Sequence, residues 1–174
     1  LLSMTYVPEH DVWGWMRHQL GGDNPRVRCL SVTREATRDR LYAVVTRFDG
    51  VNDVTATERL SVRVDTDVRK GHFLDNGAKF VYPTERAGAQ GLLHLRGQTV
   101  TVLIDGDVVT DRVVDNTGAV DFGEQTGRYA SIGLPYEALA QTLDVRFDVS
   151  GMGSTEGRFK SATEIAIRMK RSRA

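Results

Sequence analysis

Four residues near the start of the chain have side chains that could hold a metal ion. Glu9, His10 and Asp11 are consecutive, and His18 follows a short distance later. A zinc site needs its ligands to converge on one point at about 2.0–2.2 Å. In an extended segment His10 points away from the two carboxylates, because successive side chains alternate between the two faces. The sequence therefore predicts a solvated loop leading into a strand, with no metal site.

A second acidic group has part of the spacing of a calcium loop. Asp105, Asp107 and Asp111 alternate with other residues, but the sixth position lacks the glycine and the twelfth lacks the glutamate of an EF-hand. Asp105 and Gly106 stand between two β-branched runs. This pair is the strongest short signal for a hairpin with a type I′ turn, which needs positive φ at both positions. The sequence predicts a hairpin here.

Catalytic motifs do not stand out in this sequence. It contains no Walker A motif and no Gly-x-Ser-x-Gly elbow, and no spacing selects a pair of carboxylates or a Ser-His-Asp triad. We therefore assign no catalytic residue, no cofactor-binding residue and no metal ligand. We expect a protein that is not an enzyme and that carries no cofactor.

Two tryptophans form the clearest candidate surface. Trp13 and Trp15 lie on one face of a predicted strand, with Gly14 between them. Aromatic residues make up only 7% of the chain, so two on one face indicate a face that packs against another surface. We predict a packing or interface face. A platform on which sugar rings stack is the alternative, because flat apolar rings also suit that role.

The elements that position these residues are predicted to be β-strands. Alternation with period two over residues 12–19, 26–33, 40–48 and 55–64, with turn formers between the runs, predicts a four-stranded antiparallel meander. Further strands are expected at 99–104, 107–109, 119–122, 130–133, 143–149 and 163–169. A single helical turn is expected at 136–140, because Pro135 suits the start of a helix. The fold class predicted is all-β.

Composition limits the class of protein further. The 174 residues include 23 basic and 23 acidic side chains, so the formal net charge is zero, which argues against a strongly basic DNA-binding module. No apolar run approaches the roughly 18 residues of a membrane-spanning helix. The single cysteine, Cys29, excludes a disulfide framework within one chain, and its alternating strand predicts a small core residue.

The two ends and the middle of the chain suggest how it is organised. Leu1 is neither an initiator methionine nor part of a signal peptide, so we expect a piece of a longer polypeptide. A charged stretch over residues 65–73 is the best candidate for a boundary between two small domains, 1–70 and 71–174. Residues 170–173 form a short basic cluster, which we interpret as a solvated strand end.

Several segments resemble one family of viral proteins. Residues 6–18 read Tyr-Val-Pro-Glu-His-Asp-Val-Trp-Gly-Trp-Met-Arg-His, and Leu-Tyr-Ala-Val-Val at 41–45 and Thr-Glu-Arg-Leu at 57–60 follow. Together they are similar to the carboxyl-terminal part of tail proteins of short-tailed phages and prophages, variously called tail tubular protein B, tail hub or nozzle protein. The segments 94–100 and 132–136 also look similar to this family.

The resemblance implies a virion tail component that is made in the cytoplasm of a bacterial host. It implies a homo-oligomeric ring in contact with other tail subunits, with genomic DNA passing through its channel. Residues 1–70 would then look like one blade of a β-propeller, and residues 71–174 like a small β-barrel or β-sandwich. One blade cannot close a propeller, so the resemblance also implies a longer parent chain.

The expected function is therefore structural and depends on subunit contacts. The first alternative is a carbohydrate-binding β-sandwich module that uses Trp13 and Trp15 to recognise a host surface. A β-rich hydrolase is a further alternative.

Overall fold

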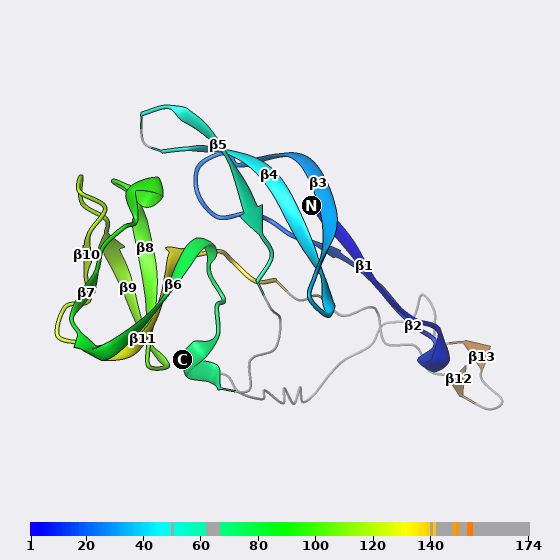
Figure 1. Cartoon of the computed structure of the whole chain (residues 1–174). Helices are drawn as coiled ribbons and strands as arrows, with labels where there is room; N and C mark the ends of the chain where they lie inside the picture. Colours follow the sequence, from blue (N-terminus) through cyan, green and yellow to red (C-terminus); the bar gives the residue numbers. More distant parts are fainter. Residues whose placement is uncertain (50, 62–66, 140, 142–147, 150–152, 155–174) are drawn as a thin grey trace. The chain divides into compact units, whose positions relative to one another are not determined.

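The computed structural model describes residues 1–49, 51–61, 67–139, 141, 148–149 and 153–154 (Figure 1). These residues form antiparallel β-sheets and three short 3-10 turns, so the all-β prediction is confirmed. Each described helical turn is three residues long, too short to span a membrane. Residues 1–137 form one compact unit. Residues 138–172 belong to a second unit, in which the structure describes the paired strands β12 (Asp148–Val149) and β13 (Gly153–Ser154).

The first two strands form a ribbon of their own. Strand β1 (Leu2–Val7) pairs with β2 (Val12–Arg17), and the 3-10 turn η1 (Pro8–His10) joins them. Asp11 completes the turn in the left-handed conformation, with φ 50°, and its N–H donates to the carbonyl of Pro8 at 3.2 Å. The predicted meander of four strands is therefore wrong in one respect, because β2 pairs with β1 instead of joining the strands that follow it.

The reason lies in the two connections that leave β2. Residues 8–11 close β1 onto β2 over a short loop, which costs little chain entropy. The longer loop that follows β2 is held elsewhere, because the N–H of Gly21 donates to Asp75 at 2.6 Å and its carbonyl accepts from Arg47 at 2.6 Å. The chain therefore reaches β3 by way of these contacts and not by a tight turn from β2.

The other three strands of the predicted meander do form one sheet. Its order is β3 (Arg26–Glu35), β4 (Arg38–Phe48) and β5 (Asp53–Arg59). The carboxylate of Asp49 accepts the N–H groups of Val51 and Asn52 at 2.8 and 2.7 Å, which closes the hairpin between β4 and β5. These hydrogen bonds lower the pKa of Asp49 below its usual value.

Cys29 is exposed on β3, so the prediction of a core cysteine is wrong. The register pairs Val27 with Val45 and Cys29 with Val44, which places one extra residue on β3 between the two pairs. The bulge does not decide the exposure, because residues 28–34 of β3 are all exposed and neither face of this part of the strand is covered.

A second sheet contains the larger core. Its order is β6 (Asp75–Arg86), β11 (Gly127–Leu134), β8 (Thr99–Ile104) and β9 (Asp107–Val113), and all pairs are antiparallel. The short strands β7 (Gly88–Ala89) and β10 (Val120–Asp121) pair beside it, as Figure 1 shows. The 3-10 turn η2 (Val68–Lys70) precedes β6 in the sequence, and η3 (Leu93–Leu95) lies between β7 and β8. The described strands form open sheets, and a closed barrel is not seen among them.

The core of this sheet is a cluster of buried apolar side chains. The buried cluster consists of Ala89, Leu92, Leu95, Val100, Val102, Ile104, Val114, Val120, Phe122, Ala130, Ile132 and Leu134. Side chains on β8 alternate between buried and less buried positions, as a strand with one face on the core requires. Among the described residues before residue 70, by contrast, Val45 is the one hydrophobic residue that is fully buried.

The predicted hairpin at Asp105-Gly106 is confirmed. Ile104 pairs with Asp107, and φ is 47° at Asp105 and 97° at Gly106. The Asp105 carboxylate accepts the N–H groups of Arg128 and Tyr129 of β11, both at 3.0 Å. This carboxylate therefore fixes the turn to the neighbouring strand.

The predicted helical turn near residue 136 is wrong for residues 136–139, which have no helical structure. Tyr136 is 51% exposed and Leu139 is 86% exposed, so no packing offsets the cost of nucleating a helix. Of the strand predicted at 143–149, the structure describes only residues 148–149. The strand predicted at 163–169 and the basic cluster at 170–173 lie outside the described residues. The division at residue 70 stays a prediction.

One buried cation connects the first half of the chain to β6. The guanidinium of Arg47, whose side chain is 10% exposed, donates to Glu58 of β5 at 2.5 and 2.9 Å and to Asp75 of β6 at 3.0 Å. Burial alone would lower the pKa of Arg47, but the hydrogen bond to Glu58 and the charge of Asp75 outweigh it and raise that pKa. Arg47 therefore stays charged and neutralises two carboxylates.

We expect Arg47→Met to lower the free energy of unfolding by about 3 kcal/mol, because it leaves two carboxylates facing each other without their cation. Urea unfolding at neutral pH measures this loss. Arg26→Met is the control, since the pair of Arg26 with Asp53 spans 3.7 Å and is half exposed. The control should lose at most about 1 kcal/mol. Equal losses in the two variants would contradict a special role for Arg47.

A second test concerns the confirmed turn. Gly106→Ala should destabilise the protein by about 1–2 kcal/mol, because a side chain is strained at its positive φ. Gly14→Ala is the matched control, since no atom lies within 4 Å of the added methyl group. Thermal unfolding should show a lower midpoint for the first variant and no loss for the second. A neutral Gly106→Ala would argue against the type I′ turn.

Candidate interaction surface

The β1–β2 ribbon carries a row of exposed apolar side chains on one face. Tyr6 lies directly across from Trp13, and Met4 directly across from Trp15. Cross-strand partners share a face of a ribbon, and so do residues two apart on one strand, which adds Leu2. We call these five residues, Leu2, Met4, Tyr6, Trp13 and Trp15, the ribbon face.

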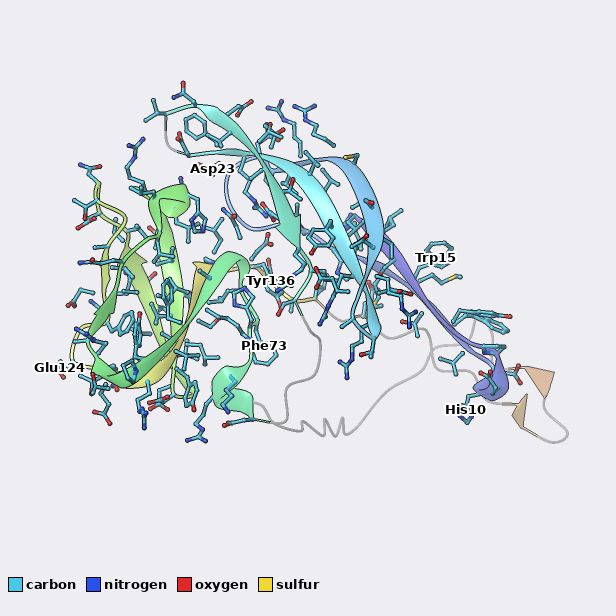
Figure 2. All side chains as sticks on the ribbon, in the orientation of Figure 1. His10, Trp15, Asp23, Phe73, Glu124 and Tyr136 are labelled. Atoms are coloured by element: carbon cyan, nitrogen blue, oxygen red, sulfur yellow. The ribbon has the colours of Figure 1, made fainter. Side chains whose placement is uncertain are left out.

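All five side chains are open to solvent in the single chain. Trp13 is 66% exposed, Trp15 73% and Tyr6 61%. Figure 2 labels Trp15 on the ribbon and His10 at its tip. On β1 the opposite face consists of Ser3, Thr5 and Val7, which are only partly exposed. The more apolar face of this strand is therefore the more exposed one, the reverse of the usual arrangement.

The exposed apolar surface of the ribbon face is comparable to the largest apolar patch of a typical monomer. An aromatic side chain covers about 150–250 Å², so the exposed parts of Tyr6, Trp13 and Trp15 amount to roughly 300–500 Å². The largest apolar patch on a typical monomer is about 300–600 Å² and is often functional. A standard protein interface covers about 800 Å² on each partner. The ribbon face can therefore supply the apolar centre of one interface.

Polar contacts close the end of the ribbon opposite to the turn. His18 N–H donates to the carbonyl of Leu1 at 2.8 Å, and the ring Nε2 of His18 lies 2.6 Å from the hydroxyl of Ser3. These contacts, with the six paired positions of the two strands, hold the register that sets Trp13 and Trp15 on one face. His18 is thus a structural residue of the ribbon.

The acidic residues at the tip are arranged differently from the sequence prediction. Pro8–His10 form a 3-10 turn, so the alternation of an extended segment does not apply to Glu9 and His10. Within the part of the chain that the structure describes, no three His, Cys, Asp or Glu side chains gather closely enough to hold a metal ion.

Sequence reasoning identified two of the five residues of this surface. It placed Trp13 and Trp15 on one face of a strand, and the structure agrees with that placement. It missed Met4, Tyr6 and Leu2, because β1 was not recognised. The alternation of these three with Ser3 and Thr5 was the available signal. Whether the face packs against another subunit stays a prediction.

No model of a known protein family matches the chain, and no curated protein matches it either. The ribbon face therefore has to be interpreted from its own chemistry.

Tryptophan fluorescence can test this surface directly. The chain has two tryptophans, and both lie on the ribbon face, so all tryptophan emission reports on it. We expect the isolated chain at low concentration to emit near the wavelength of tryptophan in water and to be quenched efficiently by acrylamide. Trp13→Phe and Trp15→Phe should each give the same result for the remaining ring. A blue-shifted, protected emission from a chain shown to be monomeric would contradict the exposed face.

Proposed function

We propose that this chain is a structural part of the tail of a phage or prophage and that it acts through subunit contacts, not as an enzyme. The observation that carries the proposal is the exposed ribbon face. Large apolar patches on soluble proteins mark interaction sites, and tryptophan and tyrosine are enriched among the residues that dominate binding energy. A face of two tryptophans and a tyrosine suits a permanent contact within an assembly.

The position of the family-like residues supports the same proposal. The most distinctive of these segments, residues 6–18, contains the end of β1, the turn η1 and all of β2. Three of the five residues of the ribbon face, Tyr6, Trp13 and Trp15, therefore lie within the stretch that resembles tail proteins. The partners proposed are other tail subunits, including copies of the same protein in a ring, and the location proposed is the virion.

The charge balance fits a wall along which DNA passes. Affinity for phosphates grows with each Lys or Arg contact and makes binding stronger at low salt. With 23 basic and 23 acidic side chains, the chain has no net attraction for a polyanion. Genomic DNA is therefore proposed as a transient neighbour, not as a ligand.

The test has two arms. Mass spectrometry of purified virions should detect peptides of this chain in the tail fraction. In the parent gene, Trp13→Ser with Trp15→Ser should lower the yield of infectious particles at least tenfold, since losing interface aromatics costs about 2 kcal/mol or more of association energy each.

Val113→Ser is the control for the second arm. Val113 is 59% exposed on β9, so the change removes exposed apolar surface away from the ribbon. We expect a normal yield from it. Absence of the chain from virions would refute the tail role, whereas presence with a normal yield from the tryptophan variant would refute the role of the ribbon face.

A carbohydrate-binding module is the second candidate function. It is favoured by one observation, the exposure of two neighbouring tryptophan rings on one face, which is the arrangement of a sugar-stacking platform. Binding to a glycan array that disappears in Trp15→Ala would support it. If no glycan on the array binds, a subunit contact is the remaining interpretation of the ribbon face.

A further inference from the structure

The two larger sheets end in four edge strands, β3 and β5 in one sheet and β6 and β9 in the other. An edge offers unpaired backbone N–H and C=O groups to another chain, and proteins commonly block it with a bulge or a proline. Three of the four edges are blocked in this way. Strand β3 carries the extra residue beside Cys29, β6 contains Pro83, and β9 shifts register beside Asp111, whose φ is 58°.

Strand β5 has no such interruption. Its seven residues pair with β4 without a register shift, and it contains neither proline nor glycine. Six of the seven are exposed, and Glu58 is the partly buried one. Among the described residues β4 is the one strand that pairs with β5, and Figure 1 shows β4 between β3 and β5. The outer edge of β5 is therefore open to another strand.

The hydrogen bonds to β4 show which backbone groups face this open edge. The N–H of Leu60, the residue after β5, donates to the carbonyl of Leu41 on β4 at 2.9 Å. Backbone groups along an antiparallel strand turn alternately to its two neighbours. Every second residue before Leu60 therefore also turns to β4, and the residues between them turn to the open edge, namely Asp53, Thr55, Thr57 and Arg59.

The sequence of β5 is complementary to itself. When two copies run antiparallel about a twofold axis at Ala56, Asp53 of one copy lies directly across from Arg59 of the other, at both ends of the pair. In the same register Thr55 lies across from Thr57. Opposite charges and threonine pairs in directly opposite positions are both favourable in antiparallel sheets. The residues that face the open edge are thus the residues that match.

Other registers match less well. A twofold axis perpendicular to the sheet permits only shifts of two residues, because side chains directly across from each other must lie on the same face. Such a shift leaves only residues 53–57 or only residues 55–59 paired. Asp53 then lies across from Thr57 in the first case, and Arg59 across from Thr55 in the second. Both shifted registers lose the two charge pairs.

We propose that two copies of this chain associate through β5 in the register centred on Ala56, so that two three-stranded sheets join into one sheet of six strands. The contact is isologous, which means that it closes on itself and joins two copies only.

This pairing does not rest on the tail role and uses no residue of the ribbon face. A ring needs a second, different contact between copies, and the two kinds of contact coexist in dihedral assemblies. A failure of the β5 contact therefore leaves the tail proposal intact, and the reverse also holds.

Sedimentation velocity of the full chain over a roughly hundredfold range of concentration tests the contact, because a dimer grows with concentration by mass action. We expect the wild type to shift from monomer to dimer. Thr57→Pro should stay monomeric throughout, since it removes a donor from the open edge and keeps the bonds to β4. Val32→Pro is the matched control. It changes the other edge of the same sheet, at a position whose partner Leu41 turns to β5, and it should dimerise as the wild type does.

Charge reversal tests the register. Asp53→Arg and Arg59→Asp should each weaken dimerisation roughly tenfold or more, because each places like charges across from each other at both ends. The double variant restores opposite charges across the twofold axis and should recover the wild-type dissociation constant. Within one chain, Asp53 lies 3.7 Å from Arg26 and Arg59 lies 3.1 Å from Glu35. The double variant breaks both of these pairs, so a recovery cannot come from inside the chain.

A wild type that stays monomeric at every concentration overturns the proposal, and so does a dimer that is lost in Trp15→Ser but kept in Thr57→Pro. Equal weakening in the single and double charge variants overturns the register. Circular dichroism of each variant checks that it is folded, and the charge variants decide the question if Thr57→Pro unfolds.

Discussion

The contact on which the first half of this molecule depends is the buried cation Arg47. It binds carboxylates on two strands, Glu58 and Asp75, and the carbonyl of Gly21 in a loop. Charge-assisted bonds of this kind are short and directional, so they fix geometry as well as contributing energy. Among the described residues before residue 70, Val45 is the one hydrophobic residue that is fully buried. Directional polar bonds therefore hold the strands of this part in place, which in most proteins is done by apolar packing.

The second sheet is stabilised in the opposite way. Its interior is a continuous apolar cluster, and its polar groups work at the turns, where Asp105 and Asp115 hold backbone N–H groups in place. This contrast explains which part of the chain leaves apolar surface exposed. A half of the chain with little apolar core of its own keeps its largest aromatic side chains outside, on the ribbon face. Apolar area that folding does not bury is available for assembly.

Local sequence patterns predicted many of the strands, but they did not predict which distant segments pair with each other. Strands β3, β4 and β5 and the hairpin at Asp105 follow from alternation and turn chemistry, which are encoded by neighbours in sequence. Strand β6 was missed because Gly77 and Pro83 interrupt its alternation. Gly77 is needed because a Cβ there would lie 2.4 Å from the carbonyl of Ile132, and Pro83 is tolerated because β6 is an edge strand.

The same limit applies to the ribbon face. The placement of Trp13 and Trp15 on one face was predictable from spacing, whereas the pairing of β1 that extends this face was not.

The exposure of Cys29 on β3 has a practical consequence. As the single cysteine of the chain, it gives a thiol-reactive dye or spin label one attachment point, on β3, without any engineering. In an assembly of identical copies each label marks the same position, so distances between labels report the arrangement of subunits. Where two such thiols come within disulfide reach, with Cα atoms about 4.4–6.8 Å apart, oxidation would join the copies covalently and record that neighbour relation.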